Sequence, residues 1–116
     1  MDTNVIAEKS FQFAVRIVNL YKYLTSQNKE YVLSKQILRS GTSIGANVSE
    51  AIRGQSKADF TAKMSIALKE ASETNYWLRL LCATEYITTE QRESLSADLT
   101  ELLSLLTAIC KTASSS

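Results

Sequence analysis

The stretch LSKQILRSGTSIGANVSEAIRGQSKADFTAKMSIALKEASETNYWLRLL, residues 33–81, decides the fold of this chain. Its first part carries an apolar residue or a glycine every three or four positions, at Leu33, Ile37, Gly41, Ile44, Val48 and Ala51. Its second part repeats this spacing at Phe60, Met64, Ala67, Ala71, Thr74, Leu78 and Leu81. Such spacing places the residues on one face of a helix. The stretch therefore predicts two amphipathic helices joined by a turn.

Two glycines lie inside the first of these helices. Gly41 and Gly45 each cost about 1 kcal/mol relative to alanine in a helix interior. Because the apolar spacing keeps its phase across them, we expect a continuous helix whose glycines let a neighbouring backbone come close. A break over residues 40–43 is the alternative. Gly54, after the last apolar position, is expected in the left-handed conformation that closes a helix.

The flanking sequence adds one helix on each side. We expect helices at about residues 3–26, 30–53, 56–83 and 89–112, with residues 113–116 as a frayed tail. Asp2 or Thr3 can cap the first helix, and capping patterns begin at Ser56 and Thr88. Four helices of similar length with short connections predict a single all-α domain, an up-and-down antiparallel four-helix bundle.

Composition agrees with this class and limits others. The 116 residues are 45% hydrophobic and 22% charged, with no proline and three glycines, which is too few turn-formers for an all-β fold. The net charge is +1, but residues 9–79 hold eleven Lys/Arg against five Asp/Glu. This basic segment indicates either solvated helix faces with complementary neighbours or a weak nucleic-acid signal.

The residue types argue against catalysis. The chain contains no histidine, which removes the usual general base and the commonest metal ligand. No glycine-rich phosphate loop is present. Cys82 and Cys110 are expected about 30 Å apart in an antiparallel bundle, too far for a disulfide, and to be unreactive thiols. We therefore predict a non-enzyme without cofactor or metal; an oxygen-only metal site of Glu50, Glu70 and Glu73 is the remaining alternative.

Location follows from what the sequence lacks. The first residues show no basic region followed by an apolar run, and no apolar stretch approaches the roughly 20 residues that span a bilayer. We expect a cytoplasmic protein without membrane contact.

Polar residues near the middle of the chain predict a network between the two central helices. Its members are Ser43, Asn47, Glu50, Glu70 and Glu73, with Glu50 pairing to Lys69 or Arg79. A buried carboxylate must be paired or hydrogen-bonded, so a structural role in fixing helix register is the first interpretation. A functional pocket is the second.

Two surfaces are candidates for partners. Phosphate contacts are predicted at Lys35, Arg39, Arg53, Lys57 and Lys63, with Arg53 and Lys57 flanking the turn before a helix N-terminus. Apolar surface beyond one core predicts a subunit interface at Trp77, Leu80, Leu103 and Leu105. The alternative is a monomer with a few exposed leucines.

Several segments resemble a known bacterial family. They are LSKQ at 33–36, RSGTSIGANVSEA at 39–51, SKADF at 56–60 and SIALKEASET at 65–74. These resemble the 23S rRNA intervening sequence proteins, over roughly residues 11–106. The resemblance implies an up-and-down bundle that assembles as a homopentameric ring. The family is similar to the accessory variability protein of diversity-generating retroelements, which binds nucleic acid and its reverse transcriptase.

Two functions are therefore expected as alternatives. The first is a non-catalytic, homo-oligomeric accessory factor that binds RNA or DNA in a ribonucleoprotein. The second is a protein–protein interaction scaffold without nucleic-acid binding.

Overall fold

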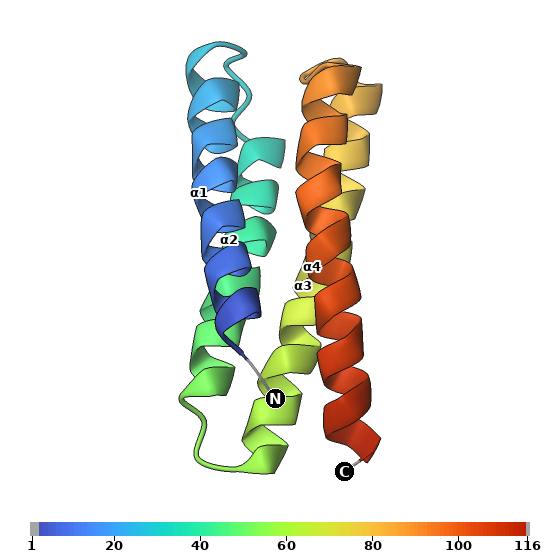
Figure 1. Cartoon of the computed structure of the whole chain (residues 1–116). Helices are drawn as coiled ribbons and strands as arrows, with labels where there is room; N and C mark the ends of the chain where they lie inside the picture. The colour runs from blue at the N-terminus through green and yellow to red at the C-terminus, as the bar shows by residue number, and fades with distance from the viewer. Residues whose placement is uncertain (1–2, 116) are drawn as a thin grey trace.

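The computed structural model describes residues 3–115, and these residues form four α-helices in an elongated bundle of 46 × 21 × 19 Å (Figure 1). The helices are α1 (Asn4–Ser26), α2 (Leu33–Ile52), α3 (Lys57–Ala83) and α4 (Thr89–Ser115). The α1–α2 and α3–α4 connections lie at one end, and the α2–α3 turn lies at the other, beside the start of α1 and the end of α4. The predicted antiparallel four-helix bundle is confirmed.

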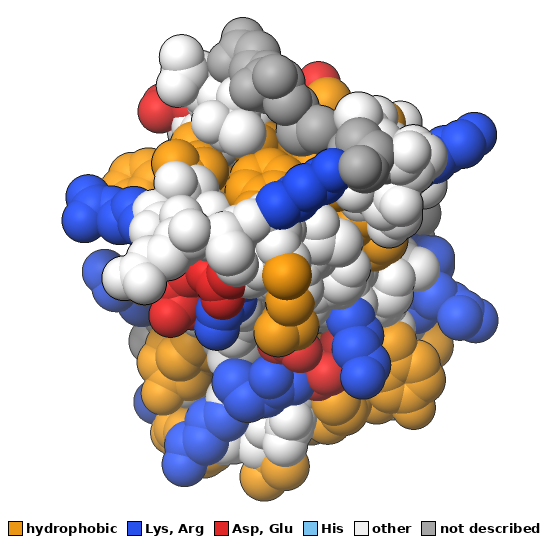
Figure 2. All heavy atoms as spheres, turned by 90° about the horizontal axis from the view of Figure 1, so that it is seen from below, with side chains coloured by type: hydrophobic (Ala, Val, Ile, Leu, Met, Phe, Trp, Pro, Cys, Tyr) orange, Lys and Arg blue, Asp and Glu red, His pale blue; other side chains and the backbone are white. Residues whose placement is uncertain are grey.

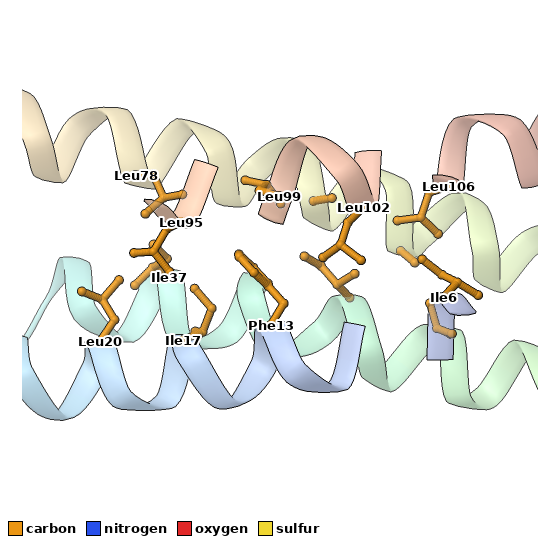
Figure 3. Packing of buried hydrophobic residues seen from close by; sticks show 14 of the residues in the cluster. Ile6, Phe13, Ile17, Leu20, Ile37, Leu78, Leu95, Leu99, Leu102 and Leu106 are labelled. Atoms are coloured by element: carbon orange, nitrogen blue, oxygen red, sulfur yellow. The ribbon is translucent and has the colours of Figure 1, made fainter. Parts of the chain in front are cut away.

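The core is one continuous apolar cluster along the bundle axis. Side chains from all four helices meet there, among them Phe13 and Ile17 of α1, Ile37 of α2, Leu78 of α3 and Leu99 of α4 (Figure 3). Each of these five is at most 1% exposed. The three-to-four spacing in the sequence therefore marks the buried face of each helix correctly.

Helices α1 and α2 approach each other closely at two glycines. A β-carbon added to Gly41 would lie 2.7 Å from Cγ1 of Ile17, and one added to Gly45 would lie 3.2 Å from the carbonyl oxygen of Ser10. Both glycines lie within an unbroken α2. The expectation of a continuous helix with close backbone approach is confirmed.

The contact between α1 and α4 is the smallest of the contacts between neighbouring helices. Two ion pairs lie along this seam: Lys9 Nζ is 3.1 Å from Glu101 Oε1, and Arg16 NH1 is 2.7 Å from Asp98 Oδ2. All four side chains are well exposed. Exposed ion pairs therefore supplement the core packing along this seam.

Three details of the helix ends differ from expectation. Helix α2 begins at Leu33 rather than near residue 30, because Lys29 has a left-handed φ of 54° and turns the chain. No described glycine has a positive φ, so the left-handed cap at Gly54 is wrong. A β-carbon at Gly54 would displace the Asp59 carboxylate, which can move aside, and would lie 3.1 Å from the Ala51 carbonyl oxygen. Helix α4 continues to Ser115, with Ala113 buried, so residues 113–115 are not a frayed tail; residue 116 lies outside the described residues.

The capping patterns predicted at Ser56 and Thr88 are confirmed. Ser56 Oγ accepts a hydrogen bond from the Asp59 amide at 3.0 Å. Thr88 and Gln91 form a reciprocal capping box, with distances of 3.1 and 2.7 Å. Thr3 makes no side-chain cap bond, and Asp2 lies outside the described residues.

The cap of α2 comes from a residue outside the helix. The Glu30 carboxylate accepts hydrogen bonds from the backbone amides of Val32, Leu33 and Ser34, at 3.2, 3.0 and 2.7 Å. Burial alone would raise the pKa of Glu30, but these three amide donors outweigh it and hold the pKa below the ordinary value of 4.5. Glu30 thus fixes the start of α2.

We predict that Glu30→Gln lowers the free energy of unfolding at neutral pH by about 1–2 kcal/mol, the scale of a lost helix cap. Because the folded pKa lies below the unfolded one, the carboxylate's contribution is present above pH 4.5 and is lost as pH falls through the folded value. Urea unfolding at several pH values should show the wild type and variant converging in acid. Glu93→Gln, at an exposed position, is the control; equal loss in both variants would contradict the assignment.

We predict that Gly41→Ala destabilises the chain by about 1 kcal/mol, because overpacking against Ile17 outweighs the better helix propensity of alanine. Ile17→Ala removes the atoms that collide, so the double variant should lose less than the sum of the two single losses. Chemical denaturation of the three variants tests this. A stabilisation by Gly41→Ala alone would show that α1 and α2 are not in tight contact.

Candidate functional site

Three predicted phosphate-binding residues surround the α2–α3 turn. Arg53 and Lys57 are exposed and Lys63 is half-buried. Figure 2 views the molecule from this end and shows more Lys and Arg than acidic side chains around it. The turn therefore concentrates three of the five predicted cations at one end of the bundle.

A polar hollow of about 590 Å³ lies at this turn. Arg53 and Lys63 line it, together with Ser56, Glu50 and Asp59. The two carboxylates make the hollow mixed in charge, whereas Lys57 stands on the first turn of α3. An anion would therefore be attracted to the rim of the hollow, where the cations and the α3 N-terminus lie.

The cations of this end are available for a ligand. Among residues 3–115, the cations held in ion pairs are Lys9, Arg16 and Arg39. No carboxylate of residues 3–115 lies within 4.0 Å of the Arg53, Lys57 or Lys63 charge. Binding a phosphate at these residues would not require breaking an ion pair.

Lys35 does not belong to this group. It lies in the first turn of α2, at the opposite end of the bundle. Eighteen residues separate it from Arg53, which corresponds to about 27 Å along a helix. The five predicted residues therefore do not form a single surface.

Arg39 is engaged within the chain. Its guanidinium donates to Glu70 at 2.8 Å and to Glu73, which also accepts from the Trp77 indole at 3.0 Å. The Trp77 hydrogen bond, followed by the Arg39 hydrogen bond, lowers the pKa of Glu73. The Arg39 side chain is 51% exposed, so this α2–α3 bridge is a surface ion pair.

The predicted polar network is arranged differently in the structure. Ser43 and Asn47 bond backbone carbonyls of their own helix, at 2.6 and 2.8 Å. Glu50 is exposed, and it forms no ion pair with Lys69 or Arg79. Glu70 and Glu73 do join α2 to α3, but through Arg39, which lies at their level along the bundle. Glu50 lies eleven residues further along α2, about 16 Å away at 1.5 Å per residue.

A buried link between the same helices lies among the apolar positions. The hydroxyl oxygens of Ser40 and Thr74 are 2.9 Å apart in a hydrogen bond, and both residues are fully buried. Each hydroxyl residue falls on its helix's apolar stripe. A polar residue in the buried phase of both helices is the sequence signal that could have identified this pair.

The predicted subunit-interface residues do not share one face. Trp77, Leu103 and Leu105 are partly buried against the chain's own core, and Leu80 is half-buried. Trp77 lies on the α2 side of α3, beside Glu73. The interface at these four residues stays a prediction.

Another exposed apolar surface lies on α1 and α2. Phe11 is 64% exposed and Val15 is 47% exposed, both on α1. Beside Phe11, a groove of about 380 Å³ runs between α1 and α2, lined mainly by small or apolar residues. The apolar periodicity of α1 does not mark this face, because Phe11 falls outside the buried stripe of the helix.

Residues 3–115 hold few features that indicate another kind of site. No group of three or more potential metal ligands is present in this range. Cys82 and Cys110 are free thiols. None of the helices formed by these residues is long and apolar enough to cross a membrane.

Comparison with known proteins identifies the class. The profile of the family described as 23S rRNA-intervening sequence protein matches residues 2–108. The chain therefore belongs to the 23S rRNA-intervening sequence protein family, as the sequence resemblance implies. No curated protein matches it.

A solved structure supports the same assignment. It is the crystal structure of a protein of unknown function from the S23 ribosomal protein family of Bacteroides thetaiotaomicron. The two chains share 63% identity with a TM-score of 0.90, over 91% of this chain and 98% of that one. Neither comparison indicates an enzymatic class.

We predict that Arg39→Gln lowers the free energy of unfolding by no more than about 1 kcal/mol, as expected for an exposed ion pair. The loss should shrink in high salt, which screens the pair. Urea unfolding at low and high salt measures both effects. Lys35→Gln, one turn away and without an ion pair, is the matched control; a larger loss there than at Arg39 would contradict the bridge.

Proposed function

We propose that this protein is a non-catalytic, homo-oligomeric accessory factor that binds RNA or DNA through the α2–α3 end of the bundle. The observation that carries the proposal is the cluster of Arg53, Lys57 and Lys63 at that end, which form no ion pair with the described residues. Such a factor would act in the cytoplasm, as a component of a ribonucleoprotein.

Phosphate recognition fits the geometry of this end. Lys57 opens α3, whose positive N-terminal dipole points toward the turn. Lysine and arginine at a helix N-terminus favour phosphate groups without reading base sequence. Binding of this kind is expected to be sequence-tolerant and steeply dependent on salt.

Assembly would compensate for the modest charge of one chain. A net charge of +1 gives a single copy little long-range attraction for a polyanion. A homo-oligomer would present several α2–α3 ends to the same nucleic acid, and linked sites raise the overall affinity. The number five for this oligomer rests on family resemblance.

We predict that Lys57→Gln/Lys63→Gln weakens binding to labelled RNA and DNA and lowers the slope of log affinity against log salt by about 1–2. Arg53 is left unchanged because it also lines the α1–α2 groove. Fluorescence anisotropy over a salt series gives both quantities. Lys22→Gln/Lys35→Gln, at the opposite end, is the control with the same charge loss.

Two results would oppose the proposal. Wild-type protein that binds neither RNA nor DNA at about 50 mM salt lacks the electrostatic attachment expected of such a factor. Equal weakening by the control pair would place the contact away from the α2–α3 end.

A second candidate function is a protein-interaction scaffold without nucleic-acid binding. The exposed apolar groove between α1 and α2 favours it, since contiguous apolar surface marks interaction sites. Failure of nucleic-acid binding together with specific, saturable binding of another purified protein would favour this alternative.

A further inference from the structure

We infer that the outer face of α1 and α2, around the apolar groove that they form, is buried against a second copy of this chain. The inference rests on the proposed homo-oligomer and assigns the surface through which it assembles. This surface is separate from the interface predicted at Trp77, Leu80, Leu103 and Leu105.

The groove is hollow in the middle, and a large apolar side chain projects from each of its two walls. Ala7, Ala14, Gly45 and Ala46 line the floor, and their small side chains leave room between the two helices. Phe11 projects from the α1 wall and Ile52 from the α2 wall, at 64% and 41% exposure. Val15 follows Phe11 by one turn and extends the apolar edge.

This shape is self-complementary. A bulky aromatic side chain stands beside a hollow of matching apolar character on the same surface. When the α1 wall of one copy lies against the α2 wall of the next, Phe11 of the first copy can fill the space over Gly45 and Ala46 of the second. Large apolar side chains seated in well-packed pockets supply most of the free energy of an interface.

The charges at the rim distinguish a second copy from an unrelated partner. Glu8 lies one turn before Phe11 on the same outward stripe of α1, since residues three apart share a helix face. Arg53 lies on the α2 wall of the groove. Neither side chain is in an ion pair within residues 3–115. When the α1 wall of one copy faces the α2 wall of another, these opposite charges meet. Arg53 then faces Glu8 of the neighbouring copy, and Lys57 and Lys63 remain available for phosphate in the oligomer.

This contact is heterologous, because the α1 wall of one copy lies against the α2 wall of the next. Repeated in the same sense, such a contact gives a ring when the rotation between copies closes.

The test is the mass in solution of full-length variants, by light scattering over a wide concentration range. Phe11→Glu should raise the dissociation constant by about thirtyfold or more, the scale of a hot-spot residue. Ala46→Glu, on the exposed α2 side, should do the same and guards against misfolding of the first variant. Circular dichroism confirms that each variant remains helical.

Two controls sharpen the result. Tyr76→Glu replaces a 54% exposed aromatic on α3 and should leave the mass unchanged. Glu8→Arg should weaken association, and the double variant Glu8→Arg/Arg53→Glu should restore it, because the exchanged charges meet again between copies.

The outcomes separate this inference from the proposed function. A wild-type oligomer that Phe11→Glu and Ala46→Glu both dissociate supports the assignment. A wild-type oligomer that neither variant changes overturns this interface and leaves homo-oligomeric assembly standing. A wild-type monomer at every concentration overturns homo-oligomeric assembly as well, whereas nucleic-acid binding is decided by the separate salt series.

Discussion

The close approach of α1 and α2 at Gly41 and Gly45 is the constraint on which the rest of the structure depends. With no β-carbon at Gly41, Ile17 packs directly against the α2 backbone, and the two helices share one buried layer. This contact fixes how α2 is rotated about its axis. The rotation in turn directs Arg39 toward Glu70 and Glu73 on α3, and leaves Ala46 and Ile52 on the outer face.

The fold could be predicted from sequence because each helix carries a strong periodic signal. The unbroken phase of the apolar stripe across Gly41 outweighed the poor helix propensity of glycine, and the structure agrees. The helix ends were harder, because they depend on backbone conformation and on single hydrogen bonds. Glu30 caps α2 from three residues before the helix begins. Lys29 adopts a left-handed conformation that its residue type does not predict. Gly54 follows the last turn of α2 without the positive φ expected of it, and a β-carbon there would be crowded by the Ala51 carbonyl oxygen.

The candidate site was harder to predict than the fold for a physical reason. A sequence gives the positions of charges along helices, but whether a charge is free depends on which neighbouring helix it faces. Arg39 looks equivalent to Arg53 in the sequence, yet its partners lie 31 and 34 residues away on α3. Phe11 shows the converse case. Its position outside the buried stripe of α1 has little meaning until α2 is placed beside it, and only then does a groove exist.

The seam between α1 and α4 gives the bundle an uneven mechanical character. Its two ion pairs are well exposed, so ionic strength weakens them. The glycine contact between α1 and α2 is a steric fit that salt leaves unchanged. A fluctuation that opens the bundle would therefore part α1 from α4 first, while α1 stays attached to α2. The bundle would open along this seam, which makes the α1–α4 edge the expected point of local unfolding.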